Sequence, residues 1–547
     1  MSKNTSALIK FYPLGGIGQI GSNMTMVEIG HQKILIDAGI LFPYENFFDI
    51  DFLIPDLEAL SRHSLKPDIL WITHGHEDHI GAIYQVVKAF PDIEIFAPRF
   101  SANLMRKKLE FQKTTHPISV YQDSFSLEVG DFTLEPIHVN HSIPDTFGLL
   151  IHSVRHSFSA FFASDFKIDD RSPYERPFDF LKLRLKTASL QKRILFADST
   201  NIESKNKNTP SEQDVFMALD AILSKTESRV FATLFSSNVH RIHSFLILAE
   251  KYQYKVVPHG RSMIGYIKSA TEEGLLPNFD HIIKSADSCH NSEENLLILL
   301  SGCQGDFLGT FRRVAMSEDS TFKPRKSDHF IISSKAIPGN EKKISLLLNK
   351  LAEIDCNIHT ADQSCIHVSG HPGKNDLLKL YNEYLPTDIF PIHGETNFLR
   401  AHCRFIKNEF PQAEAHFILN NDEVSIDSNL NISIVSHEKR EPLIYHGNSI
   451  ILEKNKISER RKLACNGSVF LTLKLNNQQY HSFRASYLGI PEYFHKEQDK
   501  FESFLLNELQ KISYKDTDES CEKIRVSIRR YFDHKLGYKP ITTVHII

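Results

Sequence analysis

The stretch "WITHGHEDHIGA", residues 71–82, places four metal-ligating side chains within six residues: His74, His76, Asp78 and His79. Alternate residues of an extended segment face the same way, so His74 and His76 can reach one ion. Asp78 and His79 follow where the chain curls into a helix, and they can reach a second ion. Two neighbouring cations need a bridging group and ligands from several segments. The cluster therefore predicts a two-metal site that is completed from further along the chain.

Three further residues of ligand type each come just beyond an apolar strand. They are His141 in "IHVNHSIPD", Asp165 in "FFASDFKID" and His393 in "DIFPIHGET". An aspartate has two carboxylate oxygens, so Asp165 suits a position that bridges two metals. A lone histidine beside an apolar strand is more often a core or surface residue. His141 and His393 are therefore candidates because they could complete the cluster.

The elements around the cluster explain how it would be positioned. Residues 68–74 are expected to form a buried strand, because 69–72 are a continuous apolar run. After the cluster, Ile80, Ile83, Val87 and Phe90 recur at helical spacing. The ligands would then lie on a loop between a strand and a helix, where α/β folds place their chemistry.

The composition limits the class of protein. A chain of 547 residues predicts two to four domains, and a net charge of −4 means that a nucleic-acid partner would need local basic patches. There is no apolar run of membrane length and no secretory signal, so we expect no membrane association. The seven cysteines are scattered without a CxxC pair, which favours a reducing, cytoplasmic location.

Further motifs accompany the cluster in a fixed order along most of the chain. They are "LGGIGQIGSNM" (14–24), "ILIDAGILFP" (34–43), "HSIPD" (141–145), "DSTN" (198–201), "SSNVHR" (236–241), "GRSM" (260–263), "IPGNE" (337–341), "HVSGH" (367–371) and "PIHGE" (391–395). Together with "THGHEDHIGA" they resemble the motifs of the ribonuclease J family, in the β-CASP branch of the metallo-β-lactamase superfamily. The resemblance implies an α/β fold: a metallo-β-lactamase αββα sandwich with an inserted β-CASP α/β domain and a small C-terminal α+β domain.

The polar segment 204–214 suits the entry to the insertion, and the charged segment 453–462 suits a linker. We therefore expect the first part of the lactamase domain at 1–205 and the β-CASP domain at 206–362. The second part of the lactamase domain would follow at 363–445, a linker at 446–464 and the C-terminal domain at 465–547.

The resemblance also implies roles for individual residues. One zinc would lie on His74, His76 and His141, and a second on Asp78, His79 and His393, with Asp165 bridging. Asp37 and Asp198 match acidic motifs near the centre, and His371 matches the histidine beside the scissile phosphate. The implied catalytic residues are Asp37, Asp78, Asp165, Asp198 and His371. Two Zn²⁺ per subunit are expected, with Mn²⁺ or Mg²⁺ as alternatives for activity.

Residues that contact RNA are implied at two loops. They are Ser236, Ser237 and Asn238 in one loop, and His367, Val368, Ser369, Gly370 and His371 in the other. Small residues after an apolar strand let backbone N–H groups approach an anion closely. His240, Arg241 and Arg261 could add positive charge there.

The chain departs from the family pattern at several positions. Ser164 stands where the family has a glycine, Gln19 replaces a common glutamate, and Cys303 lies in an altered glycine loop. Some relatives bind a structural calcium. Asp49 and Asp51 match part of that site, but His446 replaces an expected acidic residue, so calcium is not expected.

The function implied is metal-dependent hydrolysis of RNA. It would combine a 5′–3′ exonuclease that prefers 5′-monophosphate ends with endonuclease action, in RNA decay and in the maturation of ribosomal and other RNA. The family suggests a homodimer or homotetramer and protein partners in RNA decay. A DNA-directed β-CASP nuclease, a small-molecule metallo-hydrolase and a non-catalytic RNA-binding partner subunit are the alternatives.

Overall fold

The structure is a computed structural model of the chain. It describes residues 7–43, 50–57, 60, 65–337, 339–437, 440–447, 449–451, 453–476, 479–496 and 498–547. The chain forms two compact units, residues 1–41 with 54–442 and residues 42–53 with 443–547.

The first unit contains two large sheets that pack face to face. One has eight strands in the order β23 (Ile432–Val435), β22 (Glu423–Asp427), β1 (Ala7–Gly15), β3 (Met24–Ile29), β4 (Gln32–Ile36), β6 (Ile69–Trp71), β7 (Glu94–Pro98) and β8 (Ser119–Tyr121). The other has seven, in the order β21 (Glu414–Ala415), β19 (Asp388–Ile392), β13 (Lys192–Asp198), β12 (Phe158–Phe162), β11 (Phe147–Ser153), β10 (Phe132–His138) and β9 (Leu127–Val129).

Large apolar side chains fill the space between these sheets. The ring of Phe11 on β1 lies 5.7 Å from that of Phe162 and 5.1 Å from that of Phe196 on the opposite sheet. Trp71 belongs to the same buried cluster. The buried ends of β6 and β12 therefore fix the loops that follow them, and these loops carry the predicted ligands His74, His76 and Asp165.

Helices cover the outer faces of both sheets, which gives the αββα layers. On the first sheet, α4 (Arg99–Phe111) packs against β7 and β8, and α3 (Ile83–Ala89) packs against α4. On the second, α5 (Phe180–Thr187), α11 (Lys374–Tyr384) and α12 (Thr396–Glu409) bury apolar side chains in one cluster with those of β11 and β13.

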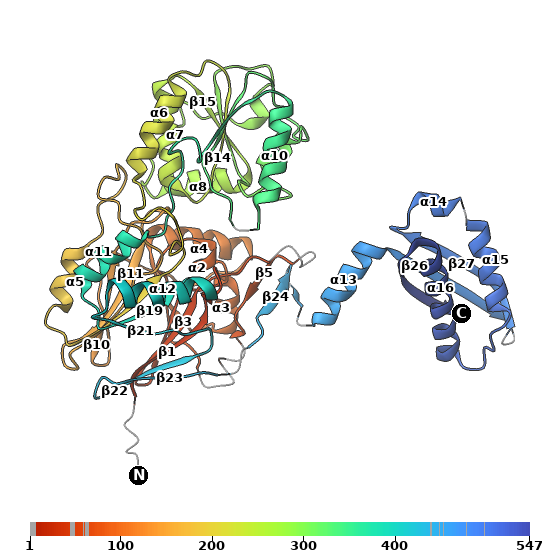
Figure 1. The fold of residues 1–547 in the computed structure, drawn as a ribbon, viewed down its shortest axis with the longest axis horizontal. Coiled ribbons are helices and arrows are strands. Elements are labelled where there is room, and N and C mark those ends of the chain that lie inside the picture. Colours follow the sequence, from red (N-terminus) through yellow and green to blue (C-terminus); the bar gives the residue numbers. More distant parts are fainter. Residues whose placement is uncertain are drawn as a thin grey trace, which may run out of the picture. The chain divides into compact units, whose positions relative to one another are not determined.

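The segment expected to be the β-CASP insertion has its own five-stranded parallel sheet (Figure 1). Its order is β15 (Lys255–His259), β16 (Leu296–Leu300), β14 (Val230–Thr233), β17 (His329–Ile332) and β18 (Asn357–Thr360). One face is covered by α6 (Glu212–Leu223), α7 (Val239–Lys251) and α8 (Arg261–Glu272), and the other by α9 (Thr310–Ala315) and α10 (Glu341–Glu353). The proposed domain limits at 205/206 and 362/363 lie before α6 and after β18.

The helix expected after the metal-binding cluster is two short helices, α2 (Glu77–Ile80) and α3. The carbonyl of Asp78 accepts a hydrogen bond from the Asn23 amide, and the amide of Ala82 donates to the carbonyl of Ala38. The continuous helical spacing predicted one helix, but these bonds to the neighbouring loop replace the helical ones. Because the helix breaks here, the short helix α2 stays part of the loop that carries the predicted ligands.

The second unit has two small sheets. One has the order β25 (Ser449–Ile451), β24 (Leu443–His446) and β5 (Phe52–Ile54). The other has the order β27 (Gln479–Leu488), β26 (Ser468–Asn476) and β28 (Ile541–Ile546), and it packs with α14 (Glu492–His495), α15 (Gln498–Leu509) and α16 (Thr517–Leu536) around Phe501, Ile528 and Phe532.

The segment expected as a linker is largely ordered. Most of it forms α13 (Lys454–Asn466), together with β25. A charged composition is common to linkers and to exposed helices, and Lys, Glu, Arg, Leu and Ala are all good helix formers. Polarity alone therefore misses the helix.

Of the residues discussed for calcium, Asp51 and His446 lie in this second unit, and Asp49 is outside the described residues. The carboxylate of Asp51 accepts a hydrogen bond from the Gly447 amide at 2.5 Å, beside His446 at the end of β24. In the part of the chain that the structure describes, no helix has both the length and the hydropathy needed to cross a membrane.

Candidate metal centre

Four ligand-type side chains meet at one end of the lactamase sheets. They come from the loops after β6, β10 and β12, and the ligand atoms of His74, His76, His141 and Asp165 all lie within 4.8 Å of one another. Nδ1 of His76 is 3.1 Å from Nε2 of His74 and 3.0 Å from Nε2 of His141. Three ring nitrogens therefore converge as ligands of one ion would.

A second group of four lies beside the first: Asp78, His79, Asp165 and His393. Oδ2 of Asp165 is 3.3 Å from Nε2 of His79 and 3.6 Å from Nε2 of His393. Asp165 thus belongs to both groups, and it is buried. This is the position a bridging carboxylate needs, and the donor set of five imidazoles and two carboxylates fits two divalent ions.

Each histidine that points Nε2 into the centre has a partner for its other ring nitrogen. Nδ1 contacts are made by His79 to Asp37 (2.7 Å), His141 to the Gly370 carbonyl (2.7 Å), His393 to Thr200 (2.9 Å) and His74 to Thr73 (3.1 Å). Such outer contacts fix the ring orientation and leave Nε2 free to bind a metal.

Asp37 is an outer residue of the centre, at the end of β4. Its carboxylate accepts from the backbone N–H of Thr73 at 2.8 Å and from the Thr73 hydroxyl at 2.8 Å, besides contacting His79. It is 4% exposed and has the left-handed φ of 61°. Of the five predicted catalytic residues, Asp37 therefore acts on the centre through His79.

The ionisation of the histidines divides them into two groups. Burial lowers the pKa of His74 and His141 well below the usual range, and it lowers that of His76 to about 4. Burial alone would also lower the pKa of His79, but the carboxylates of Asp165, Asp37 and Asp78 outweigh it and raise that pKa to about 10. The first group is neutral at pH 7 and ready to ligate, whereas His79 must lose a proton to do so.

His371 pairs with Asp198 at the edge of the centre. Nδ1 of His371 lies 2.6 Å from Oδ2 of Asp198, and the His371 ring is 5.3 Å from the rings of both His141 and His393. Burial opposes the charged imidazole, but Asp198 outweighs it, so the pKa of His371 is raised. The pair can hold a proton on Nε2 next to the metal ligands.

The loop "HVSGH" reaches the centre through its glycine. A Cβ on Gly370 would lie 2.7 Å from Cε1 of His141, so only glycine allows this approach. Asn201 holds the loop by donating to Ser369 Oγ (2.9 Å) and to the carbonyl of His371 (3.0 Å). Val368 is buried in the β-CASP core. Its side chain therefore packs there, and only its backbone is available to a ligand of the loop. His367 is half-buried.

The loop before α7 holds the other predicted RNA contacts. Ser236 and Ser237 are partly exposed, and Ser236 Oγ lies 3.1 Å from Ser262 Oγ. Asn238 caps α7, since its side-chain oxygen accepts from the amide of Arg241 at 2.9 Å. The two serines are thus partly accessible to a ligand, while Asn238 holds the helix.

Two of the three basic residues expected near RNA are unable to reach it. Arg241 is completely buried, pairs with Glu212 and donates to the carbonyl of Ile366, and His240 is buried too. The prediction of RNA charge at these two positions was wrong, because sequence does not show which face of α7 is internal. Arg261 is exposed.

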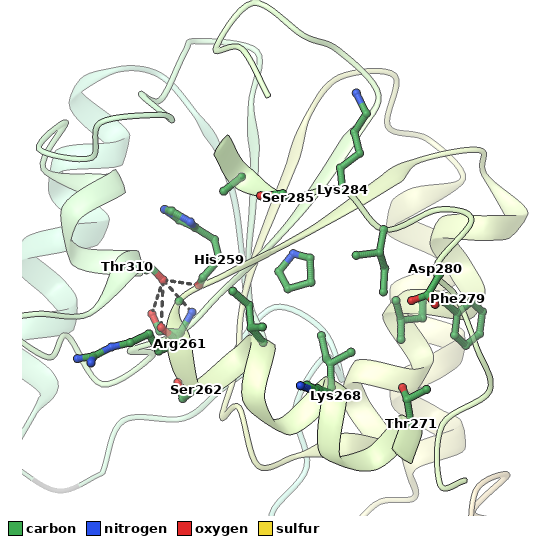
Figure 2. A pocket seen from close by; sticks show the side chains of 18 of the residues that line it. His259, Arg261, Ser262, Lys268, Thr271, Phe279, Asp280, Lys284, Ser285 and Thr310 are labelled. Carbon is green, nitrogen blue, oxygen red and sulfur yellow. Dashed lines mark hydrogen bonds between the residues drawn. The ribbon is translucent and has the colours of Figure 1, made fainter. Parts of the chain in front are cut away.

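Arg261 lines a cavity of about 1230 Å³ in the β-CASP domain. Figure 2 shows Arg261 and Ser262 near His259 and Thr310, with Lys268 further along α8. The Thr310 hydroxyl donates to the carbonyl of His259 at 2.9 Å, which ties the starts of α8 and α9 to β15. The cavity has both basic and apolar lining, and it is separate from the metal centre.

Residue-level prediction missed the hydroxyl groups around the centre. Thr73, Ser164 and Thr200 each hydrogen-bond at or next to a ligand. Thr73 precedes His74, and Thr200 lies in the motif "DSTN", so adjacency to ligands and acidic motifs was the available signal.

Comparisons with known proteins agree with this arrangement. Three family models match: the metallo-β-lactamase superfamily over residues 17–155, the ribonuclease J β-CASP domain over 227–351, and the Zn-dependent metallo-hydrolase RNA specificity domain over 353–417. A crystal structure of a protein of unknown function from Enterococcus faecalis V583 has a similar fold, with a TM-score of 0.54 and 15% identity over 76% of this chain and 99% of that chain.

Curated relatives match over nearly the whole chain. "Ribonuclease J" of Helicobacter pylori strain J99 is 30% identical over 93% of this chain and 73% of its own length. "Ribonuclease J" of Sinorhizobium meliloti is 29% identical over 98% of this chain and 96% of its own length.

The fold and the centre define a metallo-β-lactamase hydrolase with a β-CASP insertion. Within that class, the chain belongs to the ribonuclease J family, a family of metal-dependent ribonucleases.

Proposed function

We propose that this protein hydrolyses RNA phosphodiester bonds with two metal ions, as a 5′–3′ exonuclease that prefers 5′-monophosphate ends and as an endonuclease. Its place would be RNA decay and the maturation of ribosomal and other RNA. The observation that carries the proposal is the position of Asp165 in both ligand groups. A carboxylate shared by two histidine-rich groups suits a pair of ions that act on one phosphate.

Two Zn²⁺ ions fit the ligands best, one on His74, His76 and His141, and the other on Asp78, His79 and His393. Bound there, the ions would activate a water molecule and neutralise charge on the phosphate, and Mn²⁺ or Mg²⁺ could replace zinc in activity. The chain's own contribution is to hold these ligands rigidly through Asp37, Thr73 and Thr200.

His371 is proposed to give a proton to the leaving 3′ oxygen. Its Nδ1 is held by Asp198 at 2.6 Å, so Nε2 is the nitrogen available to substrate. Asp198 raises the pKa of His371, which favours the protonated ring. Products with 5′-phosphate and 3′-hydroxyl ends would result.

The proposed preference for 5′-monophosphate rests on the "HVSGH" loop. Ser369, Gly370 and the backbone of Val368 offer small, polar groups close to His141. A terminal phosphate bound there by hydroxyl and N–H groups would set the register of the RNA. A triphosphate would be too large for a loop this close to the ligands. Ser236 and Ser237 would hold further phosphates.

The first test uses one 5′-labelled RNA with a monophosphate or triphosphate end, and a matched DNA strand. Wild type is compared with Asp78→Ala. We expect labelled mononucleotide from the monophosphate RNA and none with the variant. No cleavage of either RNA by folded, metal-loaded protein would contradict the proposal. Cleavage of the DNA strand would then indicate a DNA-directed nuclease. No cleavage at all would indicate a non-catalytic RNA-binding subunit.

Light scattering would measure the oligomeric state, for which the family suggests a homodimer or homotetramer.

A further inference from the structure

Three ligand-type side chains meet at a second place in the first unit, away from the centre. His138 ends β10, Glu175 lies in the segment between β12 and α5, and His240 lies in the first turn of α7. Oε2 of Glu175 is 3.6 Å from Nε2 of His240 and 4.0 Å from Nε2 of His138. Two imidazoles from different domains thus face one carboxylate.

The polar atoms of this cluster have no ordinary partners. Both carboxylate oxygens of Glu175 and Nε2 of His240 are buried, and they have no hydrogen bond within the described part of the chain. The side chains of Glu175 and His240 are only 7% and 5% exposed, so solvent does not replace such bonds. Burying a carboxylate without hydrogen bonds is unfavourable, because it loses its hydration and gains no partner in return.

The contacts of His138 show that it does not donate a hydrogen bond to Glu175 either. Its Nδ1 lies 3.3 Å from the carbonyl of Pro177, so Nδ1 is the nitrogen that carries the hydrogen. Burial lowers the pKa of His138, which favours the neutral ring. Nε2 then presents a lone pair to the carboxylate of Glu175. Two acceptors that face each other at 4.0 Å repel, unless a cation lies between them.

We propose that His138, Glu175 and His240 bind a further divalent transition-metal ion, of which zinc is the probe of choice. Two imidazoles and a carboxylate are a common protein ligand set for such ions. Distances of 3.6 and 4.0 Å are too long for hydrogen bonds. Ligands at about 2 Å from one ion are separated by about 3 to 4 Å. Nε2 of His138 and Nε2 of His240 lie more than 4.8 Å apart, so the two imidazoles would have to approach each other around Glu175 when the ion binds.

This ion would join the two domains next to the RNA-binding loop. Tyr174 packs against His240 with the two rings 8° from parallel, and Asn140 holds the carbonyl of Arg176 at 2.7 Å. The segment that carries Glu175 is therefore fixed to the lactamase core on one side and to α7 on the other. Because Asn238 caps the same helix, the ion would steady the serines that precede it. Its role would be structural.

The test counts zinc bound to the full chain. Wild type, Glu175→Gln and His240→Gln are stripped with a chelator, reloaded with zinc, freed of excess metal and analysed by mass spectrometry of the element. His152→Gln is the matched control, because His152 is a buried histidine that pairs with Glu135 at 2.7 Å elsewhere on the same sheet. We expect one zinc fewer per chain in the Glu175 and His240 variants, and the wild-type number in the control.

A second readout separates loss of this ion from general damage. The two variants should also lose part of the rise in melting temperature that zinc gives the wild type, while the control keeps it. If Glu175→Gln fails to fold, His240→Gln decides the question on the same terms. Equal zinc content in wild type and either folded variant would overturn the proposal. The zinc count does not depend on RNA cleavage, so failure of the proposed activity would leave this result readable.

Discussion

The Ser164 hydroxyl donates to the Thr73 hydroxyl at 2.9 Å, which joins the residue before the shared ligand Asp165 to the residue before His74. Thr73 donates onward to Asp37 at 2.8 Å, and Asp37 contacts Nδ1 of His79 at 2.7 Å. A buried chain of hydrogen bonds therefore runs behind both ligand groups. Ser164 also has a left-handed φ of 56°, a backbone conformation that glycine adopts without strain.

Replacing Ser164 separates the cost of its backbone from the value of its hydroxyl. Ser164→Gly should change the free energy of unfolding by less than about 1 kcal/mol, because relief at positive φ offsets one lost hydrogen bond. Ser164→Val should destabilise the protein by about 2 kcal/mol or more, since a branched side chain is strained at this φ. Thermal unfolding of both variants checks this. Equal losses would mean that the hydroxyl, and not the backbone, limits the position.

Removing the charge of Asp37 should weaken metal binding without removing a ligand. In Asp37→Asn the partner of His79 Nδ1 is no longer a carboxylate, so zinc affinity should fall by about 10- to 100-fold. Competition with a chromogenic chelator measures that affinity. Asp319→Asn is the control, because Asp319 pairs with His259 at 2.9 Å outside the centre. An unchanged affinity in Asp37→Asn would show that His79 needs no fixed tautomer.

His371 and Asp198 should act as one unit in cleavage. His371→Ala should slow the chemical step by roughly 100-fold or more while leaving the zinc content unchanged. Asp198→Asn should give a similar loss, and the double variant should be scarcely slower than either single one, because both changes remove the same proton donor. Single-turnover rates on one RNA measure this. Losses that multiply in the double variant would argue for separate roles.

The buried pair of Glu212 and Arg241 should make stability depend on pH. Burial alone raises the pKa of Glu212, but Arg241 and Lys167 outweigh it and lower that pKa from 4.5 to about 2. The carboxylate therefore stabilises the fold fully above pH 4.5, and this contribution is lost as the pH falls towards 2. Glu212→Gln should cost about 3 to 5 kcal/mol at pH 7 and less at pH 4.

Melting temperatures of wild type and Glu212→Gln, measured from pH 7 to pH 4, check this prediction. Glu318→Gln removes an exposed partner of Arg312 and should change stability by less than about 1 kcal/mol at every pH. A gap between wild type and Glu212→Gln that stays constant over this range would contradict the sign of the shift.

Much of the fold follows from the motifs because each motif has a geometric meaning. Apolar runs followed by His74, His141, Asp165 and His393 are strands whose ends meet at one edge, and the structure brings these four residues together. The two-layer sandwich likewise follows from the resemblance. The positions of individual charged side chains did not follow, since Arg241 has the residue type of an RNA contact and the environment of a core ion pair.

Two further features were beyond sequence reasoning for a related reason. The helix α13 has the composition of a linker, because exposed helices and linkers are both polar. The cluster of His138, Glu175 and His240 draws on residues 102 positions apart (138 to 240), and none of them belongs to a ligand-spacing motif. Only the folded chain shows that their polar atoms are buried together.

Gly370 couples the loop proposed to bind RNA to the proposed metal ligand His141. Its carbonyl accepts from Nδ1 of His141, and its missing side chain leaves room for that same imidazole. One peptide group therefore belongs both to the surface proposed for the RNA phosphate and to the support of a proposed metal ligand. If bound metal strengthens RNA binding by ordering this loop, bound RNA must strengthen metal binding by the same free energy. The bound substrate would thus raise the affinity of the centre for its metal ions by the same factor.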